Sequence, residues 1–179
     1  MIETTAKLLP YKVLFSHILL IILFLALLFR NSWGAVLSRL IGKYALFLAL
    51  FVSTAAVLGS LFYSNVMGFE PCLLCWWQRI FLYPLAIIFA VAIWKKNDFA
   101  FLYALPLALL AGIVAFYQAY ANFGGLSILS CTAIEGACSK IYVMAFGYIT
   151  IPVMSLTVSL YILLLIWADR IYKNEDRNS

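Results

Sequence analysis

Charged side chains are scarce in this sequence of 179 residues, since Asp, Glu, Lys and Arg together make up only 11% of it. Soluble domains carry about 25% charged residues, so a chain with this deficit cannot cover a water-facing surface. The sequence also has no fixed-period repeat and no low-complexity linker, which argues against repeat folds and against a tethered soluble domain. What is present is 66% hydrophobic residues and a mean hydropathy of +1.06, the composition of an integral membrane protein.

The formal net charge of +5 fits the same conclusion. A basic balance can mark nucleic-acid binding, but in membrane proteins Lys and Arg concentrate in cytoplasmic loops. We therefore expect contact with membrane lipid and no nucleic-acid partner.

Five apolar stretches reach or approach the length of about 20 residues that a membrane-spanning helix needs. They cover residues 13–29, 44–67, 73–94, 99–121 and 144–167. This pattern predicts an all-α membrane protein with one helix per stretch. The polar end of the chain, DRIYKNEDRNS, is expected to be loosely ordered.

The positive charges orient these helices. If the last four stretches alternate across the membrane, the connection 30–43, the turn 95–98 and the polar tail share one side, and they hold eight of the twelve Lys and Arg residues. That side, including the tail 171–179, is predicted to be the cytoplasm. The opposite side receives residues 68–79 and 122–143, which contain all four cysteines. Paired cysteines outside the cytoplasm are expected to form disulfides.

The first stretch fits this scheme poorly, because a spanning helix at 13–29 would leave Lys7 and Lys12 outside. A cleaved signal peptide is the alternative, but cleavage needs small residues at the end of the apolar core, and the segment LALLFRNSWGA offers no convincing site. We expect an uncleaved extra helix within an N-terminal extension, residues 1–43, that either spans the membrane or lies at its interface. The single histidine, His17, is expected to pack locally rather than to bind a ligand.

The segment EPCLLCWWQR, residues 70–79, brings reactive side chains to the start of the 73–94 stretch. Pro71 suits the first position of a helix, where no N–H is needed. Cys72 would then lie in the first turn, where the helix dipole favours the thiolate and lowers the pKa of the thiol. Cys75 and Arg79 follow three and seven residues after Cys72, so the three side chains share one helix face.

Arg79 lies about 6 Å along the helix axis past Cys75, inside the apolar layer. One interpretation is an arginine that snorkels to the interface. The other, favoured by its position on the cation-poor side, is a functional cation that stabilises a thiolate or hydrogen-bonds a reducible carbonyl. Trp76 and the aromatic residues near it form either an interfacial belt or the walls of a pocket for a flat apolar ring.

The segment SCTAIEGACSK contains the second pair, Cys131 and Cys138, with Gly136 between them to allow a turn. A loop this short can close a disulfide, which is either a structural staple or an exchangeable bridge, since exposed disulfides tend to be labile. Two pairs on one side of the membrane, one in a loop and one at a helix start, suggest a redox relay.

Three motifs carry a resemblance to a known family: GSLFYS (59–64), PCLLCWWQRIFLYPL (71–85) and GYITIP (147–152). Over roughly residues 44–167 the chain resembles the DsbB family of membrane thiol:quinone oxidoreductases, and most of all its short-loop BdbC-type branch. The resemblance implies a four-helix transmembrane bundle, here residues 44–170, to which the 13–29 helix is an addition. It also implies a multi-pass protein of the bacterial cytoplasmic membrane.

The resemblance further implies roles for individual residues. Cys131 and Cys138 would take electrons from a thioredoxin-like, DsbA-type dithiol oxidase outside the membrane. Cys72 and Cys75 would pass them to a quinone, either ubiquinone or menaquinone. Arg79 matches the quinone-site arginine of the family, Trp76 is a further candidate at that site, and no metal ligand is expected.

The sequence departs from the family pattern at two places. Family members often carry a histidine near the outer end of the third bundle helix, whereas this chain reads Phe116-Tyr117-Gln118, and its first 43 residues have no counterpart. Two other functions remain open, a zinc site formed by the four cysteines and a structural membrane protein held by two disulfides. An enzyme like vitamin K epoxide reductase would place its loop pair before its Cys-x-x-Cys, the reverse of the order here.

Overall fold

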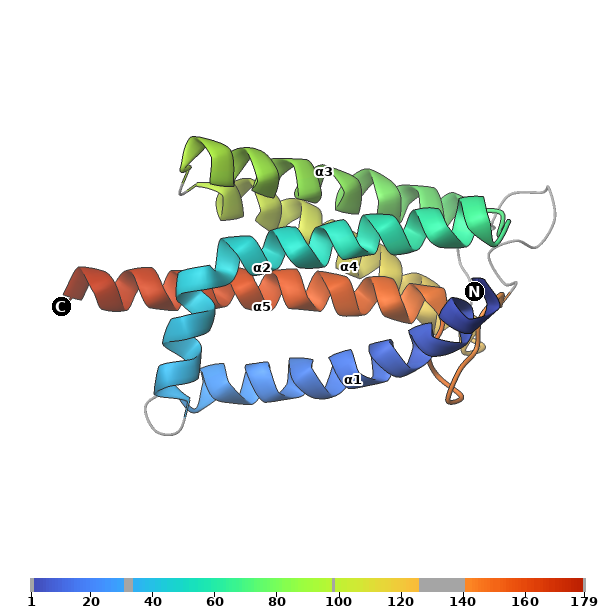
Figure 1. The fold of residues 1–179 in the computed structure, drawn as a ribbon, viewed down its shortest axis with the longest axis horizontal. Helices are drawn as coiled ribbons and strands as arrows, with labels where there is room; N and C mark the ends of the chain where they lie inside the picture. The colour runs from blue at the N-terminus through green and yellow to red at the C-terminus, as the bar shows by residue number, and fades with distance from the viewer. Residues whose placement is uncertain (1, 31–33, 98, 126–140, 179) are drawn as a thin grey trace.

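The computed structural model describes residues 2–30, 34–97, 99–125 and 141–178, and the regular elements within these ranges are all helices. The α-helices are α1 (Ile2–Leu28), α2 (Ala35–Leu61), α3 (Leu73–Lys95), α4 (Ala100–Asn122) and α5 (Ile151–Asn178), and a π-helix, η1 (Phe62–Val66), extends α2 (Figure 1). All five α-helices are long and apolar enough to cross a membrane. The predicted all-α, multi-pass membrane protein is therefore confirmed.

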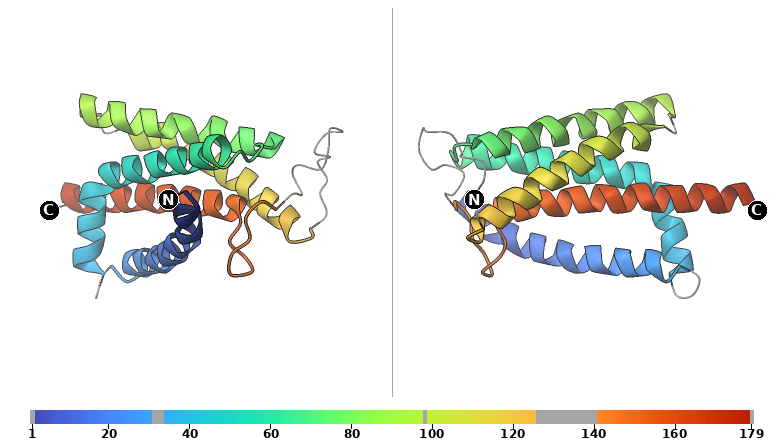
Figure 2. Two further views of the ribbon diagram at one scale, coloured as in Figure 1. Left: turned by 45° about the vertical axis from the view of Figure 1, so that its right-hand side comes forward. Right: turned by 180° about the vertical axis from the view of Figure 1, so that it is seen from behind.

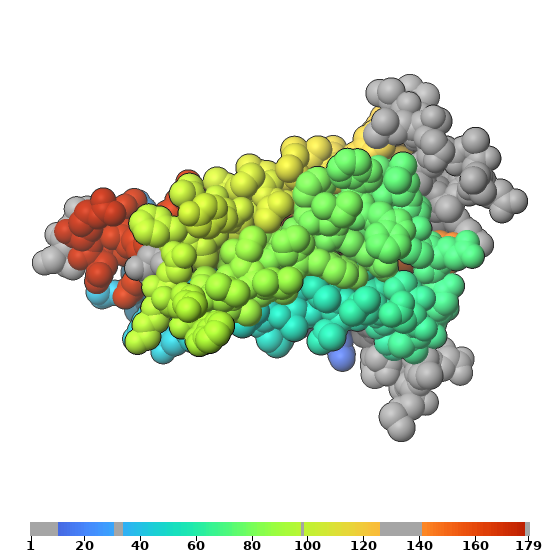
Figure 3. Space-filling model, turned by 90° about the horizontal axis from the view of Figure 1, so that it is seen from above, coloured from blue at the N-terminus to red at the C-terminus, as the bar shows by residue number. Residues whose placement is uncertain are grey.

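Four of the helices form a closed ring, in which α2 packs on α3, α3 on α4, α4 on α5 and α5 on α2. α1 lies outside this ring, against α2 and α5 (Figure 2). Seen from above, α3 and α4 cover one face of the bundle, and the end of α5 projects beyond them (Figure 3). This is the expected four-helix bundle with an additional N-terminal helix.

Small side chains allow α4 to approach its neighbours closely. Six buried alanines recur at helical spacing along one face of α4, at positions 100, 104, 108, 111, 115 and 119. Large side chains pack around the inner part of this face, among them Phe89 of α3 and Ile162 of α5. Lipid tails are as apolar as the side chains, so helices in a membrane associate by close packing, which small residues favour.

The two N-terminal helices begin earlier than predicted, α1 at Ile2 rather than near residue 13, and α2 at Ala35 rather than near residue 44. In Figure 1 the first turns of α2 run across the end of the bundle before the helix turns along it. α1 runs along the bundle in the views of Figures 1 and 2, as a spanning helix would.

Polar contacts attach α1 to α5 and the turn before it. The Thr157 hydroxyl lies 2.7 Å from His17 Nε2 and donates to the Val153 carbonyl, so the imidazole N–H donates to Thr157. The other ring nitrogen, Nδ1, lies 3.3 Å from the Tyr148 hydroxyl. His17 therefore makes contacts far along the chain, where the sequence predicted only local packing.

α5 begins at Ile151 rather than near residue 144, because residues 145–149 form a tight turn. Ala145 and Ile149 exchange two backbone hydrogen bonds of 3.0 and 2.9 Å. Between them Phe146 and Gly147 take positive φ values of 52° and 76°, which a right-handed helix cannot continue.

The far end of α5 continues to Asn178, so the predicted loosely ordered tail is wrong. Lys173 Nζ lies 2.9 Å from Asp169 Oδ2, one helical turn earlier. Such oppositely charged pairs at a spacing of four residues stabilise a polar helix segment.

Candidate active site

The Cys-x-x-Cys motif caps the start of α3. Cys72 is the N-cap residue, and its Sγ accepts a hydrogen bond from the backbone N–H of Cys75 at 3.3 Å. The helix begins at Leu73, so Pro71 precedes the cap and does not occupy the predicted first helical position. The two Sγ atoms lie 2.6 Å apart. A disulfide bond measures about 2.05 Å, so a small movement of either side chain would close one.

The Cys72 thiol does not have the lowered pKa that the sequence predicted. Its side chain is 5% exposed, and the hydrogen bond with Cys75, together with burial, raises the pKa of the Cys72 thiol. Burial disfavours the charged form of a thiol. Burial and the hydrogen bond with Cys75 together outweigh the lowering of the pKa expected from the helix dipole at the start of α3. The Cys72 thiol is therefore harder to ionise than an ordinary cysteine thiol.

Two buried glutamines adjoin the sulfurs. Gln118 of α4 donates from Nε2 to Cys72 Sγ at 3.1 Å and to Cys75 Sγ at 3.6 Å. Gln78 of α3 donates from its own Nε2 to Gln118 Oε1 at 2.7 Å. A continuous chain of side-chain hydrogen bonds thus runs from α3 through α4 to the cysteine pair.

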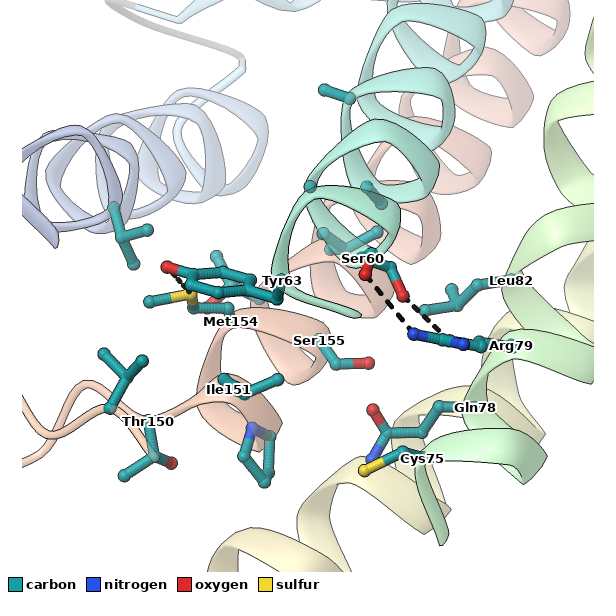
Figure 4. Close-up of a pocket in the computed structure, with 18 of the residues that line it drawn as sticks. Ser60, Tyr63, Cys75, Gln78, Arg79, Leu82, Thr150, Ile151, Met154 and Ser155 are labelled. Atoms are coloured by element: carbon teal, nitrogen blue, oxygen red, sulfur yellow. Dashed lines mark hydrogen bonds between the residues drawn. The ribbon is translucent and has the colours of Figure 1, made fainter. Parts of the chain in front are cut away.

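Arg79 is held by α2. Its Nε donates to Ser60 Oγ at 3.0 Å and its Nη2 to the Ser60 carbonyl oxygen at 3.3 Å (Figure 4). The Tyr83 hydroxyl reaches the same Ser60 Oγ at 3.1 Å, and the Arg79 guanidinium lies 5.3 Å from the centre of the Trp76 ring. These contacts hold the guanidinium against α2 at the cavity wall.

A cavity of about 500 Å³ opens beside these residues. Cys75, Gln78 and Arg79 lie on one side of it, and Ser155 of α5 points toward them from the other (Figure 4). The walls are mostly apolar. Pockets for small ligands measure about 300–1,000 Å³, so this cavity is large enough for a flat ring with polar ends.

Three buried oxygens in the cavity wall have no hydrogen-bond partner among the described residues. They are Asn122 Oδ1, Thr150 Oγ1 and Ser155 Oγ. An unpaired buried polar group is costly. These atoms are therefore suited to meet a polar group on a ligand.

Comparison with known proteins identifies the family. The family model described as Disulfide bond formation protein DsbB matches residues 42–168. This chain belongs to the DsbB family. It is a membrane protein of disulfide formation, and a disulfide oxidoreductase by family.

Curated relatives carry names of the same kind. Probable disulfide formation protein C 1 of Bacillus cereus is 38% identical over 119 residues, which are 64% of this chain and 83% of that protein. The SPbeta prophage-derived disulfide bond formation protein B of Bacillus subtilis is 40% identical over 108 residues, 60% of this chain and 73% of that protein. Probable disulfide formation protein C 2 of Bacillus anthracis is 31% identical over 138 residues, 77% of this chain and 99% of that protein. No solved structure matches the chain.

The DsbB-family match begins after α1, yet α1 contributes to the cavity. Val13, Ser16, Leu19 and Leu23 of α1 line it together with residues of the matched region. The N-terminal extension is therefore part of the candidate site, which the sequence did not suggest.

The structure brings together three of the six predicted site residues, Cys72, Cys75 and Arg79. Trp76 contacts Arg79 but is 53% exposed and does not line the cavity. Cys131 and Cys138 lie outside the described residues. Within the described part of the chain, no three His, Cys, Asp or Glu side chains gather as a metal site requires.

Sequence reasoning missed three residues of this DsbB-family site: Ser60, Gln78 and Gln118. Ser60 belongs to the GSLFYS motif that carried the resemblance, but no role was assigned to it. The two glutamines are the only ones in the sequence, and both lie in apolar stretches. Polar side chains within a membrane span are usually functional, and that signal was available.

Proposed function

We propose that this protein is a membrane thiol oxidase that reoxidises an extracytoplasmic, thioredoxin-like DsbA-type dithiol oxidase and delivers the electrons to a membrane quinone. The observation that carries the proposal is that the Cys72–Cys75 pair and Arg79 border one apolar cavity of ligand size. Family membership supports the disulfide chemistry. We infer the quinone, which is either ubiquinone or menaquinone, from the chemistry of the site and from the family. The DsbA-type partner is inferred in the same way.

The geometry of the pair favours a disulfide over the zinc alternative. Two thiolates bound to one tetrahedral zinc ion lie about 3.8 Å apart, given zinc–sulfur bonds of about 2.3 Å. The Sγ atoms of Cys72 and Cys75 are 2.6 Å apart, which is closer than zinc ligands and near bonding distance.

The proposed electron route consists of two thiol–disulfide exchanges. The two thiols of the partner reduce the Cys131–Cys138 disulfide and become a disulfide themselves. The thiols so formed reduce the Cys72–Cys75 disulfide in the same way. When Cys72 and Cys75 close their disulfide again, two electrons and two protons leave the pair, and a bound quinone supplies the acceptor for them.

The residues of the cavity fit a quinone. Ser60 occupies two N–H groups of Arg79, and a guanidinium has five, so others remain for a carbonyl oxygen. Such hydrogen bonds strengthen as the oxygen gains negative charge, which is the condition for catalysis. The unpaired hydroxyls of Thr150 and Ser155 offer donors to a second oxygen, and the apolar walls exclude water.

Both cysteine pairs belong, in this proposal, on the extracytoplasmic side of the bacterial cytoplasmic membrane. Eight of the twelve Lys and Arg residues lie in the three regions assigned to the cytoplasm. In Figure 1 the start of α3 and the C-terminus of the chain lie at opposite ends of the bundle. Residues 44–170 form the redox unit, and residues 1–43 are an extension of it.

Purified protein in detergent, supplied with a reduced DsbA-type partner and a quinone, tests this function. Cys72→Ser and Cys75→Ser should each abolish quinone-dependent oxidation of the partner while helical content is retained. Leu73→Ser, at an exposed neighbouring position, is the matched control and should retain turnover. Full turnover in either folded cysteine variant would contradict the proposal.

A further inference from the structure

The glutamine pair is a buried polar chain at a place where apolar side chains would suffice for packing. Gln78 is 6% exposed and Gln118 is 4% exposed. A buried amide without partners is costly, and these two satisfy each other through the 2.7 Å hydrogen bond between Gln78 Nε2 and Gln118 Oε1. The remaining end of Gln118 is directed at the two sulfurs.

Gln78 determines which end of the Gln118 amide faces the cysteines. Its N–H donates to Gln118 Oε1, so the NH₂ group of Gln118 must point the other way, to Cys72 and Cys75. A disulfide and a thiolate have no proton to donate, and they only accept hydrogen bonds. The fixed NH₂ group therefore suits both states through which the pair passes in thiol exchange.

We propose that Gln118 is a catalytic residue that stabilises negative charge on the sulfurs of Cys72 and Cys75, and that Gln78 is a positioning residue that holds its amide in the donating orientation. The inference rests on the proposed redox role of this cysteine pair. Hydrogen bonds to the charged form of a group favour ionisation. Loss of the Gln118 donor should therefore make the reduced pair harder to ionise.

The test measures thiol ionisation directly. In a Cys131→Ser/Cys138→Ser background, Cys72 and Cys75 are the remaining cysteines that react with iodoacetamide. Their rate of alkylation is measured at a series of pH values by mass spectrometry. Gln118→Met keeps the side-chain size but removes the donor. The midpoint, which is the pH at which alkylation reaches half of its maximal rate, should rise by about one to two pH units. Gln118→Asn, whose shorter side chain cannot reach both sulfurs, should move it in the same direction.

Gln78→Met separates the positioning role from direct contact. It should shift the midpoint less than Gln118→Met does, and should add nothing in a Gln118→Met background, because Gln118 is the glutamine that donates to the sulfurs. Leu110→Met introduces the same side chain at an exposed position of α4 and should leave the midpoint unchanged.

Unchanged midpoints in folded Gln118→Met and Gln118→Asn would overturn the inference. Quinone turnover, measured separately in the full chain, distinguishes this failure from failure of the proposed function. A shifted midpoint without turnover in the unmodified protein would support the role of Gln118 and contradict the thiol oxidase assignment.

Discussion

Ser60 on α2 accepts two hydrogen bonds from Arg79 on α3, one at its hydroxyl and one at its backbone carbonyl. This contact joins two neighbouring helices of the ring and fixes the plane of the guanidinium at the cavity wall. A donor that is already oriented needs no reorganisation when charge develops on its acceptor.

The first prediction concerns Arg79 itself. Arg79→Lys keeps the charge but loses the planar fork, and Arg79→Ala loses both, so the alanine variant should be the more impaired. A hydrogen bond to a charged group contributes about 1.5–3 kcal/mol, so quinone reduction should fall roughly tenfold to a hundredfold. Steady-state kinetics with varied quinone measure the effect. Normal quinone kinetics in folded Arg79→Ala would show that this arginine has no role at the acceptor.

The second prediction concerns the support of Arg79. Ser60→Ala removes the hydroxyl that accepts from Nε but leaves the carbonyl, so quinone KM should rise about twofold to tenfold, corresponding to about 0.5–1.5 kcal/mol. Thr54→Ala removes an exposed hydroxyl from the same helix and serves as control. In an Arg79→Ala background the Ser60 substitution should have no further effect on KM. An additive effect there would mean that Ser60 acts independently of Arg79.

The third prediction addresses the relay between the cysteine pairs. Cys131→Ser should block oxidation of the protein partner while quinone reduction by dithiothreitol partly survives, because a small dithiol can reach Cys72 and Cys75 directly. Both activities are compared in the same purified preparation. An equal loss of both would argue against two successive exchange steps.

The fourth prediction concerns the orientation of the bundle in the membrane. In a variant without native cysteines, Asn97→Cys, at the end of α3, should resist an impermeant thiol reagent in intact cells and react after lysis. Phe123→Cys, 53% exposed at the opposite end of α4, should react in intact cells. The reverse labelling pattern would invert the topology.

The helices could be predicted because the thickness of a membrane fixes the length of an apolar stretch that spans it. Their ends could not, because local interactions decide them. Positive φ values at Phe146 and Gly147 delay α5, and charge pairing such as that of Asp169 with Lys173 extends it. Neither effect changes the average hydropathy from which the spans were read.

The site was predictable only where its residues share one helix. Cys72, Cys75 and Arg79 lie within eight residues, so helical spacing alone aligns them. Gln118 and Ser60 come from α4 and α2, and their contacts depend on how those helices are rotated toward α3. Hydrophobic periodicity in an all-apolar span does not determine that rotation, because lipid-facing and buried positions have similar composition.

The alanine face of α4 has a consequence for reactivity. Ala115 and Ala119 flank Gln118, and the whole face sets how closely α4 can lie to α3 and α5. A larger side chain at a distant position such as Ala108 would push α4 outward and lengthen the contact between Gln118 and the sulfurs. Residues without any chemistry of their own would then set the distance between the helices. Variation among these alanines, which are buried between the helices, would change the strength of the oxidant while every reactive group stayed the same.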